Sequence, residues 1–275
     1  MRAQHPTRPW HALLVRVHWL LASQFGFDPI RLWRSIRGLP HFVRDWARFR
    51  RAYLGQMTLM PCLHDRFEEG GTTRNEYFWQ DLLVARSIFE TRPARHIDVG
   101  SRVDGFVAHV ASFREIEVLD VRPITTEVPG VVFRQADLMQ PLDPESLGGT
   151  CDSLSCLHAI EHFGLGRYGD PIDAHGHERG IAHMAGLLAP GGIFYLSTGL
   201  GRERVEFNAN RVFDPRSIIA LADSNGLRLK RLTLLDAHGP RETKGVDAEL
   251  VELAKGRNVL GLFVFVKTHP VGADQ

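Results

Sequence analysis

A turn near residue 100 holds the side chains whose types and spacing could do chemistry. A short apolar run over residues 96–99 leads into Gly100, and a helix-like pattern starts near Gly105. This order predicts a strand, a tight turn and the first turn of a helix, which together present backbone N–H groups to a ligand. Asp98 ends the strand, where its carboxylate could accept the charged amine of an amino-acid-like cofactor. We expect these cofactor-binding residues from the turn: Asp98, Gly100, Ser101, Arg102 and Gly105.

Two kinds of cofactor compete for such a turn. A dinucleotide site requires G-x-G-x-x-G, but Arg102 stands at the middle glycine, where a side chain obstructs the approach of the pyrophosphate. S-adenosylmethionine (SAM) carries no phosphate. Its usual pattern, D/E-x-G-x-G-x-G, keeps Asp98 and Gly100 but has Arg102 and Asp104 in place of the later glycines. The turn therefore disfavours NAD and FAD, and by itself it is a weak motif for SAM.

Two further acids follow the next predicted strands. Asp120 ends a strand over residues 115–119, about 20 residues after the turn, where an acid can hold ribose hydroxyls. Asp137 follows a third strand over residues 131–134, a place that suits the adenine amino group in SAM enzymes. We expect Asp120 with Val121 and Asp137 with Leu138 to complete the cofactor site.

Residues from about 93 to 268 resemble a class I SAM-dependent methyltransferase. The resemblance is carried by Asp98, Gly100, Asp120, Asp137, the stretch 157–162 and the segment Leu188-Ala-Pro-Gly-Gly192. The sequences of residues 96–110 and 162–171 are similar to those of an uncharacterised branch of that superfamily, domain of unknown function 268. The resemblance implies an α/β, Rossmann-like sheet of seven mostly parallel strands that ends in an antiparallel hairpin, with SAM as cofactor.

The stretch His158-Ala-Ile-Glu161-His162 is the candidate catalytic group. It matches the H-x-x-E-H signature of zinc peptidases, but that signature needs a helix, and here the stretch follows a predicted buried strand. Within a methyltransferase, one of His158, Glu161 and His162 could act as general base on a substrate hydroxyl, or together they could hold a divalent ion. A purely structural loop is the alternative.

Two polar loops offer further candidates. The loop 166–178 is rich in acids, histidines and glycines, which suits a metal or a polar substrate, although its spacing fits no defined metal loop. Asn208, Asn210 and Arg211 lie in a predicted loop over residues 199–213 and could bind a sugar, a carboxylate or a phosphate. Each loop could equally be a plain connector.

The chain divides by charge into an N-terminal extension, residues 1–70, and a methyltransferase-like domain, residues 71–275. The first 60 residues hold ten arginines, no lysine, no glutamate and two aspartates, a formal charge of +8 against a total of +1. Apolar residues between 10 and 25 and two helices starting at Asp28-Pro29 and at Pro40 make the extension basic and amphipathic. It could lie on an anionic membrane surface or pack on the core or on a partner subunit. Residues 73–76 form a capping box that opens a further helix.

The sequence predicts SAM-dependent methyl transfer to a small polar acceptor, such as a sugar or a lipid-carried surface-polysaccharide precursor. A catalytically inactive methyltransferase-like scaffold is the alternative, because glycines are missing from the turn. Three cysteines without a C-x-x-C pair suit the cytoplasm. The arginine-rich extension could add peripheral contact at the inner membrane surface. A divalent metal stays open, as does the oligomeric state, and we expect no specific nucleic acid partner.

Overall fold

The computed structural model describes residues 14, 17, 18, 20–68, 70, 71, 73, 75–243 and 247–269. The chain forms two compact units, residues 1–72 and residues 73–275, which are described separately. The apolar helix expected between residues 10 and 25 lies partly outside the described residues. Its described part includes the helical turn η1 (Leu20–Gln24).

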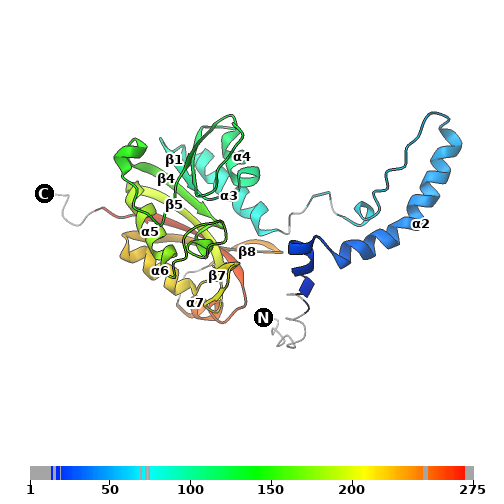
Figure 1. Ribbon diagram of the computed structural model, residues 1–275. Helices are drawn as coiled ribbons and strands as arrows, with labels where there is room; N and C mark the ends of the chain where they lie inside the picture. Colours follow the sequence, from blue (N-terminus) through cyan, green and yellow to red (C-terminus); the bar gives the residue numbers. More distant parts are fainter. Residues whose placement is uncertain are drawn as a thin grey trace. The chain divides into compact units, whose positions relative to one another are not determined.

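One long helix, α2 (Pro29–Ala52), dominates the N-terminal unit (Figure 1). Asp28 caps it, because its carboxylate accepts from the backbone N–H groups of Ile30 at 2.8 Å and Arg31 at 3.2 Å. The prediction of a separate helix starting at Pro40 is wrong, since Pro40 lies inside α2. A proline removes one backbone donor, and in a helix of 24 residues the bonds on both sides of it persist.

The N-terminal unit buries little of its apolar surface. Leu32, Trp33 and Ile36 of α2 are all exposed, and Gly38 is the one buried residue among those described before residue 73. Gly38 is buried because the Leu63 carbonyl lies where its Cβ would be. After a helical turn, η2 (Asp65–Phe67), the chain leads to the second unit. No helix in the described part of the chain has the length and apolar character needed to cross a membrane.

The C-terminal unit is built on an eight-stranded sheet in the order β3-β2-β1-β4-β5-β10-β8-β9. Strands β3 through β5 in this order are parallel, and β10 runs antiparallel to both β5 and β8. The order reverses between β1 and β4, so the loops after these strands diverge and leave a crevice at their carboxyl ends. The strands are β1 (His96–Val99), β2 (Ile116–Asp120), β3 (Val131–Gln135), β4 (Cys151–Leu157), β5 (Leu188–Leu200), β8 (Leu227–Asp236), β9 (Gly239–Glu242) and β10 (Val259–Lys267).

Helices cover both faces of this sheet and enclose two apolar clusters (Figure 1). On one face, α3 (Glu76–Thr91), the helical turn η3 (Val103–Val107) and α4 (Ala108–Ala111) pack Ile88 and Phe106 against the strands. On the other, α5 (Gly176–Leu187), α6 (Pro215–Ser224) and α7 (Asp247–Leu253) contribute Ile181 and Ile218. Short helical turns η4 (Pro144–Leu147) and η5 (Ile160–His162) flank β4.

The Rossmann-like α/β class expected from the sequence is confirmed, with three local corrections. The sheet has eight strands, because the short strand β9 adds to β8 at the edge. The predicted loop over residues 199–213 contains a two-stranded hairpin, β6 (Arg204–Glu206) and β7 (Asn210–Val212). Asn75 caps α3 in place of Thr73, since the Asn75 side chain accepts from the Tyr77 backbone N–H at 2.9 Å.

A chain that begins at Thr73 should fold by itself. Both apolar clusters are made of residues from position 79 onward, so removing residues 1–72 takes nothing from them. We expect cooperative thermal unfolding, followed by circular dichroism, with a midpoint within about 4 °C of the full chain. A broad transition, or insolubility of the shortened chain alone, would show that the first unit is part of the core.

Candidate active site

A cavity of about 610 Å³ opens at the crevice between the loops that follow β1 and β4. A smaller cavity of about 50 Å³ adjoins it beyond the ends of β2 and β3. The two share six lining residues: Gly100, Asp120, Arg122, His158, His162 and Tyr168. Most of the residues expected to bind a cofactor or to catalyse therefore converge on one continuous crevice.

Asp98 and Gly105 are exceptions, because neither lines either cavity, and Asp98 is completely buried. One carboxylate oxygen accepts from the Ser101 hydroxyl at 2.6 Å and the Ser155 hydroxyl at 2.5 Å, and the other accepts from the Ser101 backbone N–H at 3.1 Å. In this arrangement the Asp98 carboxylate has no open path to a ligand, and its contact with the amine of a cofactor stays a prediction. Asp98 fixes the turn after β1.

A buried polar chain extends this network across β1 and β4. The two ring nitrogens of His96 lie 2.8 Å from the Ser153 hydroxyl and 3.1 Å from the Ser155 hydroxyl. Burial lowers the pKa of His96 to about 3, so this imidazole is neutral. Burial raises the pKa of Asp98 to about 7, against the opposing effect of its hydrogen bonds from Ser101 and Ser155.

The turn itself differs from a glycine-rich one at Arg102 and Asp104. Gly100 adopts a left-handed backbone with φ of +71°, and a Cβ there would meet the Ala159 side chain at 2.9 Å. A Cβ at Gly105 would lie 2.6 Å from the Asp81 carboxylate, so this glycine admits a close approach from α3. Arg102 and Asp104 pair with each other at 2.8 Å and remain exposed at the rim of the larger cavity.

The residues predicted to bind ribose and adenine lie at the carboxyl ends of β2 and β3. Asp120 is nearly buried, and its carboxylate accepts from Nε and Nη2 of the Arg122 guanidinium, at 3.0 and 2.6 Å. Asp137 and Leu138 line the smaller cavity with Val121, and the Asp137 carboxylate also accepts from the Met139 backbone N–H at 2.9 Å. The structure thus brings Asp120, Val121, Asp137 and Leu138 together as expected, with the unforeseen partner Arg122 on Asp120.

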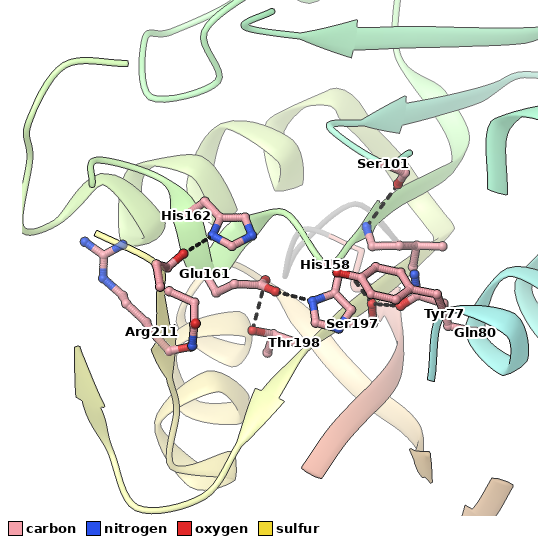
Figure 2. Close-up of polar contacts among 12 residues, drawn as sticks. Tyr77, Gln80, Ser101, His158, Glu161, His162, Ser197, Thr198 and Arg211 are labelled. Carbon is pink, nitrogen blue, oxygen red and sulfur yellow. Dashed lines mark hydrogen bonds and ion pairs between the residues drawn. The ribbon is translucent and has the colours of Figure 1, made fainter. Parts of the chain in front are cut away.

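His158 and Glu161 form a buried ion pair beside the larger cavity (Figure 2). Nδ1 of His158 lies 2.5 Å from a Glu161 oxygen, and the Thr198 hydroxyl donates to the other oxygen at 3.2 Å. Burial disfavours the charged form of both groups, but the attraction between the two charges and their hydrogen bond outweigh that effect. The pKa of His158 is therefore raised and that of Glu161 is lowered. The two charges face each other through Nδ1, while Nε2 of His158 is buried without a hydrogen-bond partner, so this pair is suited to shaping the site.

His162 has the geometry of a neutral base. Its Nδ1 lies 2.7 Å from the Ala209 carbonyl oxygen, which can only accept, so Nδ1 carries the proton. Burial lowers the pKa of His162, so Nε2 keeps its lone pair at neutral pH. Figure 2 shows Nε2 on the side of the ring away from the Ala209 bond.

Sequence reasoning missed the contribution of α3. The Tyr77 ring stacks on His158 with centroids 4.5 Å apart, and the Arg102 guanidinium lies 5.3 Å from the Tyr77 ring centroid. The Gln80 carbonyl oxygen accepts from the Ser197 hydroxyl at 2.6 Å, and that hydroxyl accepts from the His158 backbone N–H at 3.0 Å. No motif marks these residues, because only packing brings α3 against the ends of β4 and β5.

The acid- and histidine-rich loop is built around its own backbone. The Asp170 carboxylate accepts from the backbone N–H groups of Gly164, Gly166 and Tyr168 at 2.9 to 3.2 Å. This arrangement carries Tyr168 to the cavity wall. Among described residues, His64, Asp65 and Glu68 of the N-terminal unit are the one group of three side chains close enough for a metal ion. The side chains of His158, Glu161 and His162 do not converge in that way.

Asp98 substitutions test whether it holds the turn. Asp98→Ala leaves two buried hydroxyls and one N–H without an acceptor, so it should cost about 2–3 kcal/mol of unfolding free energy. The folded carboxyl holds its proton up to about pH 7 and the unfolded one releases it near 3.8, so ionising Asp98 lowers stability as pH rises between these values. Asp98→Asn should fold and lose that part of the slope. Urea unfolding at several pH values checks both, and equal stability of Asp98→Ala and wild type would contradict the assignment.

The comparisons with known proteins agree with the sequence resemblance in part of the chain. Residues 143–222 match a family model described as "Caenorhabditis protein of unknown function, DUF268". No protein with a curated description matches the chain.

Several solved structures are similar in fold at low identity. The N-methyltransferase NodS from Bradyrhizobium japonicum WM9, in complex with S-adenosylhomocysteine, is 14% identical, with a TM-score of 0.47 over 69% of this chain and 86% of its own. The amino pentose methyltransferase CalS10 from Micromonospora echinaspora, bound to SAM, is 18% identical, with a TM-score of 0.46 over 78% of this chain and 100% of its own. A 1,6-didemethyltoxoflavin-N1-methyltransferase from Burkholderia thailandensis is 12% identical, with a TM-score of 0.49 over 97% of this chain and 94% of its own.

The topology of the sheet and the family match of residues 143–222 both agree with the sequence resemblance. The sheet is mostly parallel and its strands β10 and β8 pair antiparallel, as the sequence resemblance implies. Residues 143–222 thus match the DUF268 family model and lie within a mostly parallel, Rossmann-like sheet.

Proposed function

We propose that this protein binds SAM in the crevice at the ends of β1, β2 and β4 and transfers its methyl group to a polar acceptor. The observation that carries the proposal is the convergence of Gly100, Asp120 and Asp137 on one continuous cavity at the reversal point of the sheet. Small sugars and surface-polysaccharide precursors are the acceptors that we favour.

The residues present fit the cofactor at its nucleoside end. The smaller cavity offers apolar walls from Val121, Leu138 and Met139, with the Asp137 carboxylate beside them to accept an amino group. Asp120 follows at the junction of the two cavities, within reach of a ribose. At the turn, Arg102 and Asp104 offer a cation and a carboxylate to an amino-acid end.

Bound SAM would supply a methyl group already activated by its sulfonium, so the chain must orient the acceptor, exclude water and remove a proton. His162 is the residue that we assign to proton removal from an acceptor hydroxyl, because its Nε2 is unprotonated at neutral pH. His158 and Glu161 hold the floor of the site beneath Tyr77. These two are positioning residues in the proposal.

A binding protein without catalysis is the second candidate. It is favoured by the Asp120–Arg122 pair, because a carboxylate that already has two guanidinium bonds is a weaker acceptor for ribose hydroxyls. The second candidate excludes methyl transfer, whether or not it binds SAM. The first experiment therefore measures cofactor binding, and the second measures the proton chemistry that methyl transfer needs.

Calorimetry with S-adenosylhomocysteine tests the cofactor assignment. We expect saturable binding that Asp120→Asn weakens by about 10- to 100-fold, the effect of losing a charged hydrogen-bond acceptor. Asp223→Asn, an exposed acid on α6, is the matched control and should bind like wild type. Absence of binding at millimolar ligand would remove the proposed function, whereas binding that Asp120→Asn leaves unchanged would remove only the ribose assignment.

The tautomer and titration of His162 test its role as base. In ¹⁵N-labelled protein, His162 should carry its proton on Nδ1 at neutral pH and should titrate below its usual value of 6.5, because burial disfavours the imidazolium. His162→Asn keeps a donor for Ala209 but has no base, so methyl transfer from labelled SAM to a small-molecule cell extract should fall about 10²- to 10⁴-fold.

Binding of S-adenosylhomocysteine should be unchanged in the same variant, and His238→Asn, in the exposed turn between β8 and β9, should match wild type in both assays. Full methyl transfer by His162→Asn, or a proton on Nε2, would show that another group removes the proton.

A further inference from the structure

The charges that line the larger cavity do not cancel. Four arginines and three carboxylates lie on its wall, together with His158: the arginines are Arg102, Arg122, Arg167 and Arg211, and the carboxylates are Asp104, Asp120 and Glu161. Each carboxylate is already paired, Asp104 with Arg102, Asp120 with Arg122 and Glu161 with His158. Two guanidinium groups, those of Arg167 and Arg211, are left without a carboxylate in the cavity.

The guanidinium of Arg211 is occupied by hydrogen bonds within the protein. Arg211 is 5% exposed, and its guanidinium donates to the backbone carbonyls of Phe163, Asp173 and Ala174 at 2.5 to 3.3 Å. These bonds tie β7 to the loop after η5, so its donors are committed to the fold. This leaves Arg167.

Arg167 is held in place while most of its donors stay free. Its Nη1 donates to the Ala209 carbonyl at 2.8 Å, and its guanidinium lies 5.2 Å from the centroid of the Tyr168 ring. It forms no ion pair with any carboxylate among the residues that the structure describes. Asp170, three residues further on, is instead occupied by three backbone N–H groups of the loop.

The position of Arg167 relates it to the proposed base. Its Nη1 is 3.3 Å from Nδ1 and 3.5 Å from Nε2 of His162, and both side chains share the Ala209 carbonyl as acceptor. The Tyr168 ring contacts both Arg167 and Arg122, because the Arg122 guanidinium lies 4.4 Å from the ring centroid, and Arg122 in turn donates to Asp120. A guanidinium without a carboxylate partner thus lies beside the proposed base, on the wall of the same cavity as Asp120.

We propose that Arg167 binds an oxyanion of the acceptor, a phosphate or a carboxylate carried close to the group that is methylated. A guanidinium with free, parallel N–H groups matches the two oxygens of such an anion. A cavity wall with excess positive charge, which a cationic cofactor would increase, favours an anionic acceptor over a neutral one. The identification of the anion's carrier as a methyl acceptor rests on the proposed function, whereas the oxyanion site itself does not.

Arginine side-chain NMR on the full chain tests the site with inorganic phosphate as probe and acetate in a second series. At constant ionic strength, either anion should produce a saturable shift of the Arg167 Nε–Hε resonance, assigned by its loss in Arg167→Lys. Arg167→Gln should weaken anion binding at least about tenfold, and Arg167→Lys should retain part of it as a point charge.

Arg228→Gln is the matched control. Arg228 is exposed near the start of β8, where it pairs with Val266 near the end of β10, and it lines neither cavity. It should bind phosphate like wild type. Equal loss in Arg228→Gln and Arg167→Gln, or no saturable shift with either anion, would overturn the oxyanion site.

Calorimetry with S-adenosylhomocysteine separates this inference from the proposed function. Its affinity should be the same in Arg167→Gln and wild type, since the acceptor end is altered and the nucleoside end is not. A matched loss of S-adenosylhomocysteine affinity in Arg167→Gln would assign Arg167 to the cofactor and overturn the inference. Phosphate binding at Arg167 in a protein that does not bind S-adenosylhomocysteine would instead leave the oxyanion site standing and refute the methyltransferase proposal.

Discussion

The buried carboxylate of Asp98 is the interaction on which the site geometry depends. It accepts from two serine hydroxyls and one backbone N–H, and in this way it joins the turn after β1 to the neighbouring strand β4. Ser101 in turn accepts from the Leu157 backbone N–H at the end of β4. The turn after β1 and the end of β4, which both border the cavity, are therefore fixed to each other by buried hydrogen bonds.

The second constraint is the packing of α3 against the end of β4. His158 has a left-handed backbone, with φ of +55°, which is uncommon for a residue with a side chain. Its ring is held by Tyr77 on its face and by Glu161 at Nδ1, and its backbone N–H is held by Ser197. The helix thus fixes a conformation that the sequence of the loop alone does not favour. As a result, His162 is presented one helical turn later with its Nδ1 on the Ala209 carbonyl.

The strands and the crevice were predictable from the sequence because they depend on local pattern. Buried parallel strands appear as short apolar runs between turns, so β1 and β10 agree with their predicted bounds. The acids Asp120 and Asp137 end or follow predicted strands, and both line the smaller cavity at the carboxyl ends of β2 and β3. The membrane contact expected for the arginine-rich extension stays a prediction.

What the sequence could not supply are contacts between distant segments. Whether Asp98 faces the cavity or the turn is decided by Ser155 on β4, and the pairing of Asp120 is decided by the rotamer of Arg122. The hairpin β6–β7 is polar and short, and it is held by Arg211 bonds to carbonyls of the loop after η5. Pro40 shows the converse, because a strong local signal for a helix start is overridden within a long, capped helix.

A crystal structure of the complex with S-adenosylhomocysteine is the most direct test of the central claim, that the cofactor lies at the ends of β1, β2 and β4. The adenine should lie between Val121 and Leu138 beside Asp137, and the ribose hydroxyls should bond to Asp120, with Asp98 still buried beneath the turn. A ligand bound elsewhere on the chain, or one that draws Asp98 out of its bonds to Ser101 and Ser155, would contradict it.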